Sequence, residues 1–108
     1  MRSDFWLQEM RQAALRVLDY TAGLEFADFV GDSRTYDAVL FNLERLGLAA
    51  SRVPPEERDG YAELPWEQLT SLSQIFIRLH FGVQDEIVWN LIKSKLPKWL
   101  SLLAAPKA

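Results

Sequence analysis

Residues 33–55 read SRTYDAVLFNLERLGLAASRVPP, and this stretch decides the fold class. Its apolar residues recur every three or four positions, as on one face of an α-helix. They are Tyr36, Val39, Leu40, Leu43, Leu46, Gly47 and Ala50. The predicted helix starts near Asp32–Ser33 and ends at Pro54-Pro55, because proline lacks an amide donor and clashes with the preceding turn. Gly47 costs about 1 kcal/mol relative to alanine inside a helix, so we expect another helix to approach closely there.

The segment before this helix predicts a first amphipathic helix over residues 3–22. Ser3 is a suitable N-cap because its hydroxyl can accept an unpaired backbone N–H. Gly23 suits the left-handed conformation just past a helix end. Residues 24–31 are expected to form a short connector whose two phenylalanines pack on the core.

The second half of the chain predicts a loop and two more helices. Residues 54–64 are the most loop-like part. A helix over 65–81 is apolar around most of its girth, which is typical of a central or subunit-interface helix. The last helix spans roughly 84–104, where Pro97 must kink it or begin a new segment. The predicted fold is all-α, an up-and-down bundle of four main helices in one domain over residues 1–108.

The composition excludes several kinds of chemistry. Hydrophobic residues make up 49% and charged residues 25%, as in an ordinary soluble domain. The absence of cysteine excludes a disulfide, a thiolate zinc site and a cysteine nucleophile. His80 is the single histidine, so a zinc site with three or four ligands is not expected, and the five scattered glycines form no phosphate loop. We therefore expect no metal and no cofactor.

The location predicted from the sequence is the cytoplasm. No apolar run approaches the ~18 residues of a membrane span, so no membrane partner is expected. The N-terminus lacks the basic-then-apolar pattern of a signal peptide, because Asp4, Gln8 and Glu9 interrupt it.

The charge is unevenly distributed along the chain. Residues 1–70 hold 13 acids and 7 bases, giving −6, whereas residues 71–108 hold 2 acids and 5 bases, giving +3. The basic third can meet a phosphate backbone or an acidic partner, or it can be a solvated helix face that carries Lys93, Lys95 and Lys98.

Arg78 and His80 are the candidate catalytic residues. A histidine titrates near neutrality and can carry the proton of an RNA 2′-hydroxyl or leaving oxygen. An arginine can stabilise the crowded phosphorus centre, so the pair could support RNA cleavage without a metal. Equally, two cations near a helix C-terminus interact favourably with the helix dipole and need no function.

A series of short motifs runs along nearly the whole chain and resembles the HepT-like branch of the HEPN families. Their order and separations carry the resemblance. The pieces are Tyr36-Asp37-Ala38-Val39, Asn42-Leu43-Glu44, Leu46-Gly47, Ala49-Ala50, Leu64-Pro65-Trp66, Phe81-Gly82-Val83, Glu86-Ile87-Val88-Trp89 and Leu96-Pro97.

The resemblance implies both an architecture and partners. Family members are helical bundles that dimerise through the motif helices. They typically pair with a minimal nucleotidyltransferase, as a ribonuclease toxin and its antitoxin. In characterised pairs the nucleotidyltransferase adenylylates a tyrosine just after the catalytic histidine. The resemblance therefore implies a homodimer, a nucleotidyltransferase partner and RNA as a possible ligand.

The chain departs from the family at the ribonuclease motif. Aligned on Phe81-Gly82-Val83, Ser73 takes the position of the family's arginine and Gln74 that of its asparagine. Arg78 takes the position of the catalytic histidine, and His80 that of the modified tyrosine. Because arginine is not deprotonated in proteins, position 78 lacks a proton carrier at neutral pH.

Two smaller departures accompany these. Leu79 stands where the family has glycine, and Leu48 replaces an acid that commonly follows the glycine of the second helix. Leu79 and Ile75 make the former active face more apolar, which suits packing better than RNA contact.

Three functions remain open from the sequence. The first is a HEPN protein that has kept the fold and partners but has lost most ribonuclease activity. The second is an active metal-independent endoribonuclease that uses Arg78 and His80 across the dimer, since a two-fold axis can bring one subunit's arginine near the other's histidine. The third is a nucleotide- or substrate-binding accessory of the nucleotidyltransferase.

Overall fold

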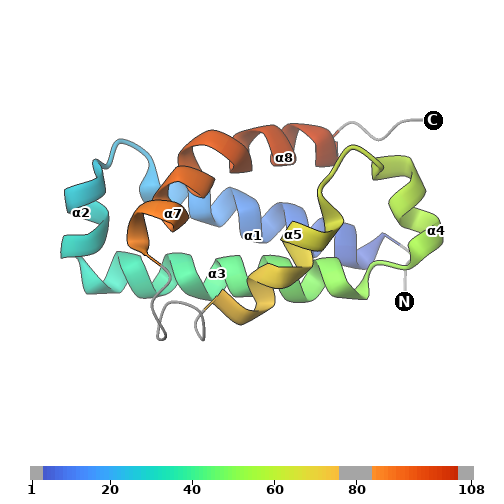
Figure 1. The fold of residues 1–108 in the computed structure, drawn as a ribbon, viewed down its shortest axis with the longest axis horizontal. Helices are drawn as coiled ribbons and strands as arrows, with labels where there is room; N and C mark the ends of the chain where they lie inside the picture. The colour runs from blue at the N-terminus through green and yellow to red at the C-terminus, as the bar shows by residue number, and fades with distance from the viewer. Residues whose placement is uncertain (1–3, 76–83, 105–108) are drawn as a thin grey trace.

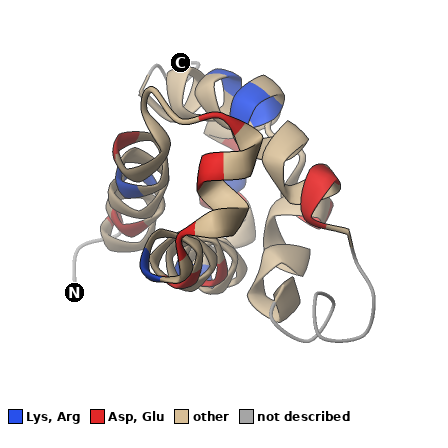
Figure 2. Ribbon diagram, turned by 90° about the vertical axis from the view of Figure 1, so that its left-hand side faces the viewer, with Lys and Arg blue, Asp and Glu red and all other residues tan. Residues whose placement is uncertain are grey.

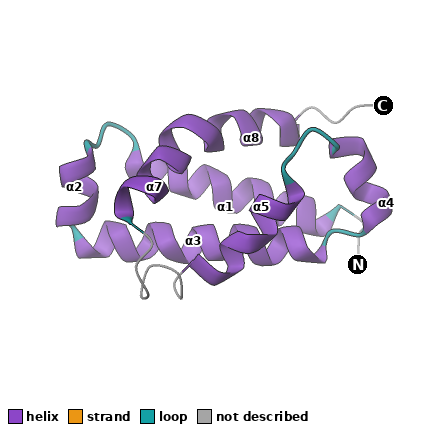
Figure 3. Ribbon diagram, viewed as in Figure 1, coloured by secondary structure: helices purple, strands orange, loops and turns teal. Residues whose placement is uncertain are grey.

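The computed structural model describes residues 4–75 and 84–104, and within these ranges it is helical with no strand (Figure 3). The elements, in chain order, are α1 (Phe5–Thr21), α2 (Phe26–Gly31), α3 (Ser33–Arg52), α4 (Pro55–Arg58), η1 (Asp59–Tyr61), α5 (Trp66–Ser71), η2 (Leu72–Gln74), α7 (Asp85–Asn90), η3 (Leu91–Lys95) and α8 (Leu96–Ala104). The expected all-α bundle is confirmed.

Two long helices form the frame of the bundle. α1 and α3 lie antiparallel side by side, and α8 packs along α1 (Figure 1). α5 and η2 cross α3. The second half of the chain therefore contacts α3 through α5 and η2, and contacts α1 through α8. The core lies between these elements and contains fully buried side chains from α1, α3, α5, η3 and α8. These include Met10, Val17, Leu43, Leu46, Leu69, Ile92 and Leu96.

The crossing of α3 by η2 depends on Gly47. A Cβ atom at this position would lie 2.7 Å from the carbonyl carbon of Leu72 and would also overlap the backbone nitrogen of Ser73. Real Cβ atoms do not approach backbone this closely, so only glycine permits the contact. The close approach that the sequence predicted at Gly47 is therefore confirmed.

The first helix and its end agree with expectation. α1 runs from Phe5 to Thr21, and Gly23 adopts a left-handed φ of 75°. Ser3, the predicted N-cap, lies outside the described residues.

The two segments that the sequence assigned to connector and loop are helical, which corrects both predictions. Residues 26–31 form α2, because Glu25 and Asp28 make a reciprocal capping box at its start. Residues 55–61 form α4 and η1. The prolines that end α3 also begin α4, since Pro55 at the first helical position has its φ preset.

The third helix is not the continuous helix that we expected over 65–81. The α-helix begins at Trp66 after Pro65 and tightens at Leu72 into a 3₁₀ turn over residues 72–74. This change of pitch occurs where the backbone of Leu72 and Ser73 presses on Gly47. Residues 76–81 lie outside the described part.

The last helix changes its hydrogen-bond pattern just before Pro97. Proline has no N–H to donate to the carbonyl four residues earlier. A π-helical turn, η3, precedes it, and the Leu96 N–H bonds the carbonyl of Leu91, five residues back. The helix therefore continues past Pro97 into α8. No helix within the described ranges is long and apolar enough to span a membrane.

The Gly47 crossing gives a direct stability prediction. Gly47→Ala should lower the free energy of unfolding by about 1–3 kcal/mol, because the new methyl group must displace backbone. Gly31→Ala is the matched control, since a Cβ at Gly31 meets nothing within 4 Å. Urea unfolding followed by circular dichroism compares the two. Equal stability of the two variants would show that the contact at Gly47 is not tight.

Candidate functional site

The structure describes two of the four predicted site residues. Ser73 and Gln74 lie in the 3₁₀ turn η2. The Ser73 hydroxyl is half-buried and donates to the carbonyl oxygen of Thr70 at 3.0 Å, whereas Gln74 is exposed. Arg78 and His80 lie outside the described residues.

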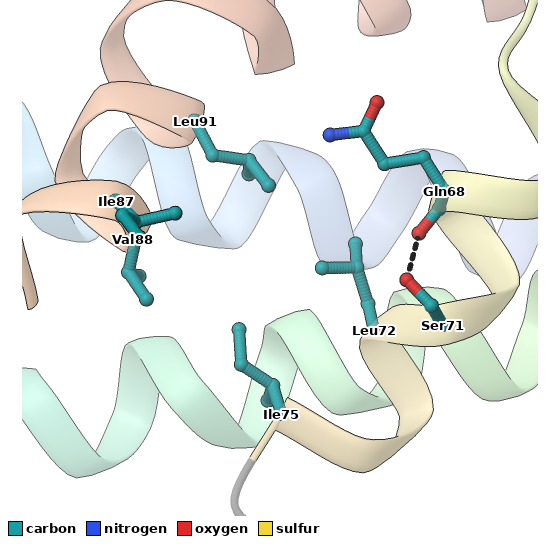
Figure 4. Close-up of a pocket in the computed structure, with 7 residues that line it drawn as sticks. All are labelled: Gln68, Ser71, Leu72, Ile75, Ile87, Val88 and Leu91. Atoms are coloured by element: carbon teal, nitrogen blue, oxygen red, sulfur yellow. Dashed lines mark hydrogen bonds between the residues drawn. The ribbon is translucent and has the colours of Figure 1, made fainter. Parts of the chain in front are cut away.

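A groove lies between η2 and α7, beside the predicted motif. Its volume is about 120 Å³. Figure 4 shows that its two walls come from separate parts of the chain, with α5 and η2 on one side and α7 and the start of η3 on the other. Seven residues line it: Gln68, Ser71, Leu72, Ile75, Ile87, Val88 and Leu91.

The groove is mainly apolar. The lining residues Ile75 and Val88 are buried, while Ile87 on the α7 wall is 61% exposed. The polar lining is Gln68 and Ser71, and the Ser71 hydroxyl donates to the Gln68 carbonyl at 2.7 Å (Figure 4). No ionisable side chain is among these seven residues. The described walls therefore suit apolar contact and supply no general acid or base.

α3 holds both walls of the groove. η2 is fixed at Gly47, and α7 is fixed by a hydrogen bond in which the Tyr36 hydroxyl donates to Asp85 Oδ1 at 2.6 Å. Burial, reinforced by the hydrogen bond and negative charge of Asp85, raises the pKa of Tyr36 to about 12. Tyr36 therefore stays a neutral donor at physiological pH.

An aromatic cluster supports the α7 wall from the other side. The ring of Phe29 stacks on Trp89 with centroids 5.1 Å apart and lies 5.2 Å from the ring of Tyr36. Lys93 Nζ lies 4.6 Å from the centroid of Trp89 and donates to the Thr21 carbonyl at 3.2 Å. This cluster joins α2, α3 and α7.

No metal centre is found in the part of the chain that the structure describes: no three acidic or histidine side chains lie close enough to hold an ion. The paired acids Asp85 and Glu86 occupy the first turn of α7, where they face the positive end of the helix dipole.

The family model of ribonuclease HepT-like proteins matches residues 10–105. The chain belongs to the HepT-like family. The resemblance that the short motifs indicated is thereby confirmed, over nearly the full length of the bundle.

Several curated HepT-like relatives match this chain. "Putative RNase MJ0127" of Methanocaldococcus jannaschii is 31% identical over 75% of this chain and 67% of its own length. "Probable ribonuclease HepT" of Thermococcus cleftensis is 27% identical over 85% of this chain and 84% of its own length. "Putative RNase TTE0752" of Caldanaerobacter subterraneus is 28% identical over 86% of this chain and 83% of its own length. No solved structure is significantly similar.

Sequence reasoning missed the Tyr36–Asp85 pair. The two residues are 49 positions apart, so no local pattern links them. Tyr36 was visible as part of an apolar stripe and of a family motif, and neither pattern indicates a partner for its hydroxyl. Their contact follows from the packing of α7 on α2, the short helix that directly precedes α3 in the chain.

Proposed function

We propose that this HepT-like protein is the partner of a minimal nucleotidyltransferase in a toxin–antitoxin type pair, and that it has lost most of the family's ribonuclease activity. It acts as a homodimer, and it needs neither metal nor cofactor. The described helices keep the scaffold on which the family's activity is built.

The observation that carries this proposal is that the ribonuclease motif lacks a positive charge at position 73 and a proton carrier at position 78. Ser73, at the family's arginine position, has a short side chain whose hydroxyl bonds the Thr70 carbonyl of its own helix. A serine there gives no fixed positive charge to a phosphate. Arg78, at the histidine position, cannot take a proton from an RNA hydroxyl. Loss of one general acid–base alone typically lowers a rate ~10²–10⁴-fold.

The groove supports the dimer. Ile87 is a large apolar side chain with 61% of its surface exposed beside an apolar groove, and such a surface favours association. In a two-fold dimer the same patch meets itself, so the exposed Ile87 of one subunit can fill the groove of the other. A cavity of about 150 Å³ holds a benzene ring, so a 120 Å³ groove accepts one aliphatic side chain.

An active endoribonuclease is the second candidate. It is favoured by the names of the three relatives above, each of which contains RNase or ribonuclease. In this alternative, Arg78 of one subunit and His80 of the other act on the same phosphate. A cleavage assay separates the two functions.

The cleavage prediction concerns His80. Purified protein incubated with tRNA or mRNA in EDTA should cleave no faster than His80→Ala, because a site without a proton carrier at position 78 cannot start the reaction. Product is measured on a denaturing gel over time. Cleavage by the wild type that disappears in His80→Ala would establish the second candidate instead.

The dimer prediction concerns Ile87. The wild type should sediment as a dimer at micromolar concentration. Ile87→Asp should raise the dimer dissociation constant more than tenfold, because a charge would be buried without a partner. Leu15→Asp, at a residue of α1 that is 52% exposed and lies outside the groove, should leave the dimer unchanged. A monomeric wild type, or equal effects of the two substitutions, would refute this interface.

A further inference from the structure

The outer face of η3 and α8 carries hydrogen-bond donors and no acid. Residues 87–104 contain five hydroxyl or amine side chains, those of Lys93, Ser94, Lys95, Lys98 and Ser101, and no aspartate or glutamate. Ser94, Lys95, Lys98 and Ser101 are all exposed, although the Ser94 hydroxyl already donates to Asn90 Oδ1 at 3.0 Å. Figure 2 shows the basic stretch of η3 and α8 at the top edge of the molecule. We call these four residues the α8 face.

The α8 face is compact. Ser94, Lys98 and Ser101 follow one another at spacings of four and three residues, which places them on neighbouring turns of a helix. Lys95 precedes Lys98 by three residues. Seven residues of helix rise by about 10 Å, so the donors are close enough to contact neighbouring phosphates of one strand.

The two lysines of the α8 face differ from the other nearby cations. Lys93 bonds the Thr21 carbonyl and lies over Trp89, and Arg11 bonds the Leu103 carbonyl. Those two charges are used inside the fold. Lys95 and Lys98 have no carboxylate within salt-bridge distance in the described ranges, so their charges are available to a ligand.

The composition of this face favours a nucleic acid over an acidic protein. Protein interfaces need apolar or aromatic anchors at their centre. The exposed large apolar residues of the described chain lie elsewhere, and none falls between 88 and 104. Lysine and serine side chains are instead among the usual donors to phosphate oxygens in nucleic-acid complexes.

The charge distribution makes the attraction local. Residues 1–70 carry a formal charge of −6 and repel a polyanion, whereas residues 71–108 carry +3. Binding through bulk charge is thereby disfavoured, so contact with a polyanion depends on local cations such as those of the α8 face.

We propose that the α8 face binds the phosphate backbone of RNA. This inference rests on the proposed function, because it assigns an RNA contact to a HepT-like protein that no longer cleaves efficiently. Phosphate contacts position a strand without reading its sequence. The binding is therefore independent of sequence and sensitive to salt.

Fluorescence anisotropy of a labelled 20-nucleotide oligouridylate, in EDTA and at salt from 50 to 200 mM, tests the proposal with the full chain. Removing two phosphate contacts by Lys95→Ala/Lys98→Ala should reduce the slope of log affinity against log salt by about 1.4. A slope of about 1.4 means that the contribution of these two contacts to the affinity falls about sevenfold when the salt concentration rises fourfold. Lys95→Arg/Lys98→Arg should retain binding.

The matched control removes two exposed cations elsewhere. Arg16→Ala/Arg34→Ala changes the net charge by the same amount on α1 and α3, and it should leave the salt slope unchanged. Equal losses in the two double variants would overturn the proposal, because bulk charge would then explain binding. So would undetectable binding of the wild type at 50 mM salt, or competition by polyglutamate as effective as that by unlabelled RNA.

The same samples, run afterwards on a denaturing gel, keep the two hypotheses apart. Intact RNA with no binding overturns the α8 face and leaves the proposed loss of cleavage standing. Cleavage of the RNA that requires His80 overturns the proposed function, whatever the anisotropy shows.

Discussion

The contact of Gly47 with the backbone of Leu72 and Ser73 is the constraint on which the rest of the structure depends. It lets η2 lie directly on α3 without intervening side chains. The contact thereby fixes the position of η2, which forms one wall of the groove and carries Ser73 at the start of the family's motif. The Tyr36–Asp85 hydrogen bond sets the other wall from the same helix. A single long helix, α3, thus determines the shape of the candidate site.

Cations from other elements secure the ends of the long helices. The last carbonyl groups of a helix have no partner within it, and a positive charge there also complements the dipole. Three helices receive such a donor: Lys93 bonds Thr21 in α1, Arg58 bonds Ala50 in α3 and Arg11 bonds Leu103 in α8. These basic residues stabilise the bundle and are not free to contact a ligand. Charge counts from the sequence therefore overstate what the surface offers to RNA.

The sequence predicts the frame of this fold better than its connections. The apolar stripe of α3, the close approach at Gly47 and the left-handed Gly23 follow from local rules. The helical turns α2 and α4 were missed, because their caps and prolines also suit loops. The 3₁₀ turn η2 depends on a contact with α3 that is distant in sequence. At the candidate site, Ser73 and Gln74 are placed in η2, while the contributions of Arg78 and His80 remain predictions from the family motif.

The central claim is that a HepT-like scaffold persists here without the side chains that cleave RNA. Restoring them is the most direct test. Ser73→Arg/Arg78→His should cleave RNA in EDTA at least ~100-fold faster than the wild type, since one general acid–base contributes about 10²–10⁴-fold. Circular dichroism and sedimentation establish that the variant keeps the fold and assembly of the wild type. A wild type that cleaves through His80 as fast as this variant, or a correctly assembled variant that stays inactive, would contradict the account.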